Sequence, residues 1–146
     1  MFELDDIAAD EIMTRRTDVI MLDVEDSAEV WRKTIFETRH TYYPICEGTA
    51  DKIIGILNAN EYFRLENKSR ESVMQYAVNQ AYFVPETVKA DTLFGKMKKE
   101  SYAIAVVLDE YGGMSGIITM NETFAVYAKN RTSYAIFFFY TKNMLR

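Results

Sequence analysis

One short pattern occurs twice in the sequence, and this repeat constrains the fold more than any other feature. Residues 55–61 read GILNANE and residues 116–122 read GIITMNE. In both copies a glycine and aliphatic residues precede a polar residue, and an acid follows three positions later. Aliphatic residues of this kind are typical of a buried strand, and the polar residue and acid are typical of a helix start. The repeat therefore predicts two copies of a strand that runs into a helix.

The residues before the first copy predict the rest of a small unit. Residues 19–22 form a short apolar strand, and residues 26–29 read DSAE, a capping box that opens a helix. The residues predicted to form the buried face of this helix are Val30, Trp31, Ile35 and Phe36. Strands over 42–46 and 52–57 follow, and a second helix begins at Asn58.

The second copy repeats this order of strand, helix, strand, strand and helix. Residues 83–84 form a strand, and Asp91 caps the helix that follows. The inward-facing residues of that helix are Leu93, Phe94 and Met97. Residues 103–108 and 116–119 then form a hairpin with its turn at 109–113.

The doubled order predicts an α+β fold of two repeats related by a pseudo-twofold axis. Each repeat has a small sheet and only two helices to cover it. The two copies should therefore pack sheet against sheet. We predict a first repeat at 8–66, a linking helix at 67–82, a second repeat at 83–128 and an atypical basic aromatic tail at 129–146. All 22 acids lie at or before Glu122, which marks a break in composition before the tail.

The tail contains an uncharged, β-prone aromatic run, SYAIFFFY, at residues 133–140. Such a run promotes aggregation when it is exposed. We therefore expect it to be buried as an added strand or clasp at a dimer interface. Two alternatives stay open: the tail is foreign to the module, or its basic and aromatic residues contact a membrane.

Composition argues against several classes of protein. A net charge of −5 gives no support for nucleic-acid binding. The single cysteine, Cys46, suits a reducing cytosol, and no window approaches the roughly 18 apolar residues of a membrane helix. His40 is the only histidine, and the adjacent acids Asp109 and Glu110 either bind a cation or are solvated on their turn. We expect a soluble domain without a metal site and, because no catalytic motif is visible, without enzymatic activity.

Four motifs accompany the repeat: IMTRRTDV at 12–19, HTYYPI at 40–45, FVPET at 83–87 and VLDEYGG at 107–113. With them the chain resembles, over about residues 8–122, a tandem pair of CBS domains, the cystathionine β-synthase type regulatory module. FVPET followed by DEYGG narrows the resemblance to the CorC and haemolysin-like family of magnesium and cobalt efflux proteins. Members of that family place the pair after a membrane domain and before a small C-terminal domain.

The resemblance implies a regulatory module that binds an adenine nucleotide, AMP or ATP, on the cytoplasmic side of a membrane. Its implied partners are the nucleotide, a second copy in a homodimer and the membrane domain of the full-length protein, with no nucleic acid. In such pairs the nucleotide lies between the copies. Carried over to this sequence, the better site comprises Thr14, His40, Thr41, Tyr42, Tyr43, Pro44, Ile45, Ile118, Thr119 and Glu122. The second, weaker site comprises Asn58, Glu61, Thr87 and Ala103.

The residue types at the better site suit this ligand. Backbone groups around Pro44 can meet the adenine edge, and Thr119 offers a hydroxyl. Free N–H groups of the following helix favour a phosphate, and Glu122 can accept hydrogen bonds from ribose hydroxyls. Tyr42 stands where the family commonly has a phosphate-facing arginine, so we expect AMP to bind better than ATP.

Other interpretations of these residues stay open. Glu61 and Glu122 could cap their own helices without touching a ligand, and His40 could be a partly buried ring rather than a pocket residue. The alternative function is a dimerisation or interaction module with no physiological nucleotide. The helices after the two strand-to-helix turns are predicted to expose apolar residues at a dimer interface: Tyr62, Phe63, Leu65 and Phe124.

Overall fold

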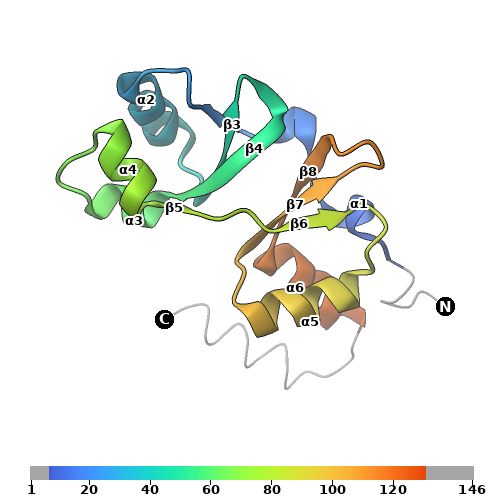
Figure 1. The fold of residues 1–146 in the computed structure, drawn as a ribbon. Coiled ribbons are helices and arrows are strands. Elements are labelled where there is room, and N and C mark those ends of the chain that lie inside the picture. The colour runs from blue at the N-terminus through green and yellow to red at the C-terminus, as the bar shows by residue number, and fades with distance from the viewer. Residues whose placement is uncertain (1–6, 131–146) are drawn as a thin grey trace.

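The structure, a computed structural model, describes residues 7–130 and has the doubled element order (Figure 1). The first half contains α1 (Ala9–Ile12), β1 (Thr14–Arg15), the 3-10 helix η2 (Arg16–Asp18), β2 (Leu22–Asp23), α2 (Ala28–Thr38), β3 (Tyr42–Glu47), β4 (Thr49–Asn58) and α3 (Ala59–Arg64). The second half contains α4 (Arg70–Tyr76), β5 (Val78–Asn79), β6 (Phe83–Pro85), α5 (Ala90–Glu100), β7 (Ile104–Leu108), β8 (Met114–Thr119) and α6 (Met120–Asn130). The predicted tail at 129–146 lies almost wholly outside the described residues, and the aromatic run lies entirely outside them.

The strands form two separate sheets, in the orders β2-β3-β4-β5 and β1-β8-β7-β6. In the first sheet β2 runs parallel to β3, and β3 and β4 form an antiparallel hairpin. The second sheet repeats this arrangement with β6, β7 and β8. Two sheets with the same internal order confirm the predicted α+β fold of two related repeats.

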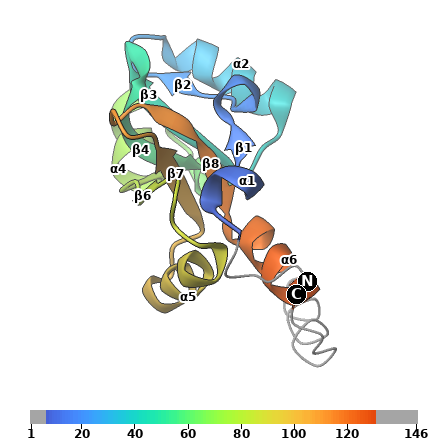
Figure 2. The ribbon, with the colours of Figure 1, turned by 90° about the vertical axis from the view of Figure 1, so that its right-hand side faces the viewer.

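Each sheet is completed by a short strand from the other half of the chain. β1 pairs antiparallel with β8, so Thr14 lies opposite Ile117. β5 pairs antiparallel with β4, so Val78 lies opposite Leu57. Figure 2 shows α1 and β1 beside β8. Strands of two residues are too short to show a period of alternation, so the sequence pattern does not indicate this exchange.

Apolar side chains fill three layers. One layer lies between the first sheet and its helices and includes Trp31, Ile35, Tyr43 and Leu57. A second lies under α5 and includes Val84, Leu93, Met97, Ala105, Val107 and Ile118. The third lies between the two sheets and contains Cys46, Ile53, Ile56, Ile104, Val106 and Met114. The two sheets therefore pack against each other as predicted, and Cys46 is a buried core residue.

Several local predictions around the helices are wrong. Ser27, rather than Asp26, caps α2, because its hydroxyl accepts a hydrogen bond from the Val30 N–H at 3.2 Å. Only part of the predicted apolar face of α2 is buried, since Val30 and Phe36 are 46% and 48% exposed. Lys89 occupies the N-cap position of α5, and Asp91 lies inside its first turn.

The predicted strand at 19–22 and the predicted linking helix at 67–82 are also shifted. The paired strand begins only at Leu22, where it meets β3. The helix of the link ends at Tyr76, and the next residues leave the helix to form β5. Pairing with an exposed strand edge has here replaced the helical continuation that the local sequence favours.

The exchange of β1 and β5 explains why both copies of the repeat begin with glycine. A Cβ at Gly116 would overlap the Thr14 carbonyl oxygen and approach Met13 Sδ to 2.9 Å. A Cβ at Gly55 would lie 2.7 Å from Val78 Cγ1. Only a residue without a side chain allows the exchanged strand to come this close.

We predict that Gly116→Ala lowers the free energy of unfolding by about 2 to 3 kcal/mol, because backbone must move to admit the methyl group. Urea denaturation of the purified protein measures this change. Gly95→Ala is the matched control, since a Cβ there meets no atom within 4 Å and the residue lies inside α5. The control should raise stability by about 0.5 to 1 kcal/mol. Equal effects of the two substitutions would contradict the proposed close approach.

Candidate functional site

A cavity of about 240 Å³ lies where β1 crosses from the first half to the second sheet. Three segments line it: residues 14–20, here called the crossing segment; the entry to β3; and the end of β8 with the first turn of α6. The lining residues are Thr14, Asp18, Val19, Ile20, His40, Thr41, Tyr42, Ile117, Thr119 and Glu122. The cavity is therefore built by both halves of the chain.

Most of the residues predicted for the better site meet at this cavity. Those that line it are Thr14, His40, Thr41, Tyr42, Thr119 and Glu122. The remaining four are buried elsewhere: Tyr43, Pro44, Ile45 and Ile118. Tyr43 and Ile45 pack in the core under α2, and Ile118 packs in the core under α5.

Strand alternation explains why Ile117, rather than Ile118, lines the cavity. Successive side chains of a strand point to opposite faces, so Ile117 shares a face with Thr119 while Ile118 points into the core. Spacing alone could therefore have identified Ile117. Asp18, Val19 and Ile20 were missed because they lie between β1 and β2, where no periodic pattern indicates their orientation.

Thr119 and Glu122 are bonded to each other at the start of α6. The Thr119 hydroxyl accepts a hydrogen bond from the Glu122 N–H at 3.3 Å and donates one to Glu122 Oε1 at 3.1 Å. Thr119 thus caps the helix, and the Glu122 carboxylate bonds the hydroxyl of this capping residue. The Met120 N–H donates to the Ala103 carbonyl at 2.8 Å. At these two positions the expected free N–H groups are already hydrogen-bonded.

Burial raises the pKa of Glu122 above its ordinary value, and hydrogen bonds with Thr119 and Thr14 oppose this rise. The carboxyl group is half-buried, so ionising it costs more free energy than in water. Shifted carboxyl groups in a cavity are typical of binding and catalytic sites.

The cavity lining is acidic. Asp18 and Glu122 contribute carboxyl groups, and no lysine or arginine is among the described residues that line the cavity. His40 lies at the edge of the site as an exposed residue, with its ring edge-on to Tyr43 at 5.8 Å. Its backbone N–H donates to the Tyr43 hydroxyl at 2.7 Å. This composition offers hydrogen bonds to a polar ligand but little attraction for several phosphate charges.

A second cavity, of about 460 Å³, occupies the pseudo-equivalent place on the other side. Its lining residues are Tyr42, Ile56, Asn58, Asn79, Gln80, Glu100, Ser101, Tyr102, Ala103 and Ile104. Of the predicted second site, Asn58 and Ala103 line this cavity and Glu61 and Thr87 do not.

Glu61 and Asn58 have local roles in helix α3. Asn58 Oδ1 accepts hydrogen bonds from the N–H groups of Asn60 and Glu61, at 2.9 and 3.4 Å. The Glu61 carboxylate instead pairs with Arg64 at 3.0 Å. Thr87 is an exposed residue of the turn after β6.

Asp109 of the DEYGG motif shapes a turn. Asp109 Oδ1 accepts hydrogen bonds from the N–H groups of Tyr111 and Gly113, at 2.9 and 2.8 Å. Gly112 adopts a φ of 83°, which favours glycine. Within residues 7–130, no group of three or more histidine, cysteine, aspartate or glutamate residues could hold a metal ion. No helix in the same part of the chain is long and apolar enough to cross a membrane.

Comparison with known proteins assigns this arrangement to a family. The model of the CBS domain family matches residues 9–66 and 73–128. The UPF0053 protein YrkA of Bacillus subtilis is 36% identical over 127 residues, which cover 84% of this chain and 29% of YrkA. The magnesium and cobalt efflux protein CorC of Pasteurella multocida is 25% identical over 123 residues, which cover 84% of this chain and 41% of CorC. The chain therefore spans less than half the length of these relatives.

Solved structures share the fold. A CBS-domain pair with bound AMP from Klebsiella pneumoniae has a TM-score of 0.77 at 21% identity, covering 84% of this chain and 98% of that one. The CBS domain of a bacterial CNNM/CorC family Mg²⁺ transporter in complex with ATP has a TM-score of 0.74 at 24% identity, covering 84% and 88%. At these identities the likeness establishes the fold alone. The chain is a pair of CBS domains and belongs to the CBS domain family, with UPF0053, CorC and haemolysin C proteins as its relatives.

Proposed function

We propose that this CBS pair is a regulatory module that binds an adenine nucleotide in the 240 Å³ cavity and belongs to an ion transport protein of the CorC and haemolysin-like kind. The observation that carries the proposal is the convergence of Thr14, Tyr42, Thr119 and Glu122 from both halves on one cavity. Related CBS structures that contain AMP or ATP support the same class of ligand.

The lining suits the nucleoside part of such a ligand. Val19, Ile20 and Ile117 provide an apolar surface for the adenine ring. The Glu122 carboxylate can accept hydrogen bonds from ribose hydroxyls, and the Thr119 hydroxyl can bond a polar group of the ligand. We assign the second cavity, at Asn58 and Ala103, to a weaker site of the same kind.

We expect the cavity to prefer AMP to ATP. The lining that residues 7–130 provide has no lysine or arginine to pair with phosphates, and Asp18 and Glu122 repel additional negative charge. Tyr42 occupies the place where a phosphate-facing arginine is common in the family. Each added phosphate therefore brings charge without a matching cation.

Regulation follows from the position of the cavity. A ligand that contacts both halves favours the relative position of the halves in which these contacts are made. We infer that this preference is passed to the membrane domain of the full-length protein, from the cytoplasmic side.

An exposed aromatic surface favours the alternative, a dimerisation module. The aromatic surface consists of Phe36 on α2 and Phe63 on α3, and their rings lie 5.3 Å apart. Phe63 is 45% exposed. The prediction from the sequence that Tyr62 and Phe124 are exposed is wrong, because both side chains are buried in the core. Paired aromatic side chains exposed on two adjacent helices suit a homodimer contact.

We predict that AMP stabilises the protein and that Thr119→Ala weakens its binding by about 0.5 to 1.5 kcal/mol, the value of one neutral hydrogen bond. Calorimetry with AMP, ADP and ATP measures the affinities. At 100 times its dissociation constant a ligand should add about 2.7 kcal/mol to stability in a thermal melt. Thr119→Ser keeps the hydroxyl and should bind AMP as the native protein does. Thr87→Ala removes an exposed threonine outside both cavities and should have no effect. No heat with any adenine nucleotide would leave the dimerisation module as the better proposal.

We predict that Glu122→Gln stabilises the protein at neutral pH but weakens AMP binding. A raised pKa in the folded state means that the protonated form contributes stability at low pH, and that this contribution is lost as pH rises through the folded pKa. Glutamine resembles the protonated acid at every pH, so its advantage in melting temperature should disappear as the pH is lowered. Glu61→Gln, which changes the equivalent acid outside both cavities, should show no such gain. A difference in melting temperature that stays constant across the pH range would count against a raised pKa of Glu122.

We predict that the native chain is a homodimer at micromolar concentration and that Phe36→Glu or Phe63→Glu makes it monomeric, because a charge in the aromatic surface must be desolvated on association. Light scattering gives the mass. Tyr111→Glu is the matched control, since Tyr111 is 90% exposed on the turn between β7 and β8, away from this surface. A monomeric mass for the native chain would rule out this interface.

A further inference from the structure

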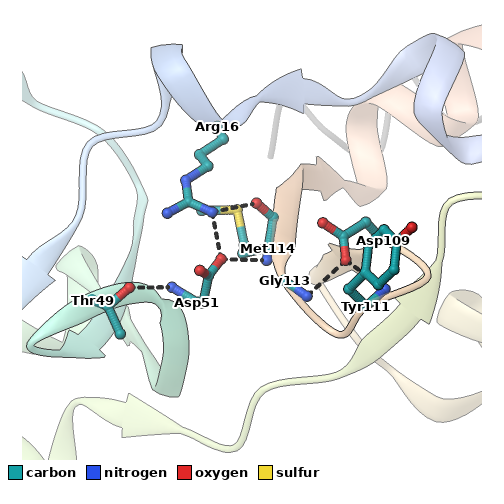
Figure 3. A network of polar contacts seen from close by, with 7 residues as sticks. All are labelled: Arg16, Thr49, Asp51, Asp109, Tyr111, Gly113 and Met114. Atoms are coloured by element: carbon teal, nitrogen blue, oxygen red, sulfur yellow. Dashed lines mark hydrogen bonds and ion pairs between the residues drawn. The ribbon is translucent and has the colours of Figure 1, made fainter.

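One carboxylate of the first sheet bonds two elements that belong to the second sheet and the crossing segment (Figure 3). Asp51 Oδ1, on β4, accepts a hydrogen bond from the Met114 N–H at 3.0 Å and pairs with the Arg16 guanidinium. The same guanidinium donates to the Met114 carbonyl at 3.3 Å. These contacts join β4, β8 and η2 in one closed network.

Arg16 lies in the middle of the crossing segment that lines the cavity. Arg15 is the last residue of the segment paired with β8, and Leu22 is the first residue paired with β3. Between them the chain lies outside both sheets, and Asp18, two residues after Arg16, lines the cavity. The contact of Arg16 with Asp51 and Met114 therefore anchors the part of the segment that no strand pairing holds.

The DEYGG turn orients the backbone on the β8 side of this network. Asp109 binds the Gly113 N–H, and the next N–H, that of Met114, meets Asp51. A Cβ at Gly113 would lie 3.0 Å from Asp51 Oδ1 and 2.9 Å from Asp109 Oδ2, so glycine leaves room for both carboxylates. The turn thus presents one backbone donor to the other half of the molecule.

The network is polar and exposed to solvent, and the Asp51 carboxylate within it is ionised. The Met114 N–H and then the Arg16 guanidinium hold the pKa of Asp51 below its ordinary value, so the carboxylate stays charged at neutral pH. The side chains of Arg16 and Asp51 are 42% and 49% exposed, so solvent screens their attraction. Contacts of this strength contribute more to geometry than to overall stability.

We propose that Asp51 is a positioning residue for the cavity: through Arg16 and Met114 it fixes the crossing segment against both sheets. The effect on ligand affinity rests on the proposed function, whereas the effect on the crossing segment does not. A ligand that contacts Thr14 and Asp18 requires the segment in one position, so loss of the anchor adds the cost of ordering it to the cost of binding.

The test compares Asp51→Ala with Glu47→Ala. Glu47 lies on the same hairpin, is similarly exposed at 47%, and pairs at 3.2 Å with Lys52, so this ion pair stays within the first sheet. Hydrogen exchange without ligand should be faster in residues 14–20 of Asp51→Ala and unchanged in Glu47→Ala. Calorimetry with AMP should show affinity reduced about two- to fivefold in Asp51→Ala, the range expected for one exposed ionic contact, and unchanged in the control.

Further variants separate positioning from general destabilisation. Asp51→Asn keeps an oxygen for the Met114 N–H but loses the charge opposite Arg16, so its exchange rates should be intermediate. Arg16→Ala combined with Asp51→Ala should have a smaller effect than the sum of the two single changes, because each single change already removes the Arg16–Asp51 pair. Unchanged exchange in residues 14–20, or faster exchange throughout the core, would overturn the proposal. If native protein binds no AMP, the proposed function fails, and the exchange result alone then decides the role of Asp51.

Discussion

Each half adds one short strand to the sheet of the other half, and the rest of the structure depends on this exchange. β1 completes the second sheet and β5 completes the first. Each of these strands lies close to a glycine of its neighbouring strand, where a side chain would block the approach. Separating the halves would expose unpaired strand edges and the apolar layer that contains Ile56 and Val106. The exchange also brings Thr14 beside Ile117, and the cavity forms around this pairing.

Polar groups of both halves line the cavity at the junction, and neither half alone covers these groups. Glu122 is half-buried there and is only partly compensated by hydrogen bonds with Thr119 and Thr14. A carboxyl group in such surroundings costs stability, and sites of this kind persist where a ligand uses them. Asp51 illustrates the opposite case, since backbone and guanidinium donors stabilise its charge at an exposed position.

Aromatic residues show the limits of prediction from helical spacing. Trp31 and Ile35 were placed correctly in the core, because α2 presents them to Tyr43 and Leu57. Tyr62 and Phe63 are adjacent in the chain and therefore lie about 100° apart around the helix axis. The rotation of α3 against its sheet buries Tyr62 and exposes Phe63. Spacing gives the separation of two side chains around a helix but not the direction in which the sheet lies.

The sequence by itself determined the doubled order of elements and the two strand-to-helix turns, because local periodicity, capping and turn residues encode them in neighbouring positions. Most of the polar residues that meet at the cavity were predicted from the resemblance of the sequence to CBS domain pairs. Only the tertiary structure decided that β1 and β5 exchange sheets, that residues 18–20 line the cavity, and that Asp51 reaches Met114. Each of these depends on contacts between segments far apart in the chain, whose relative position is set by the packing of the whole core rather than by any local pattern.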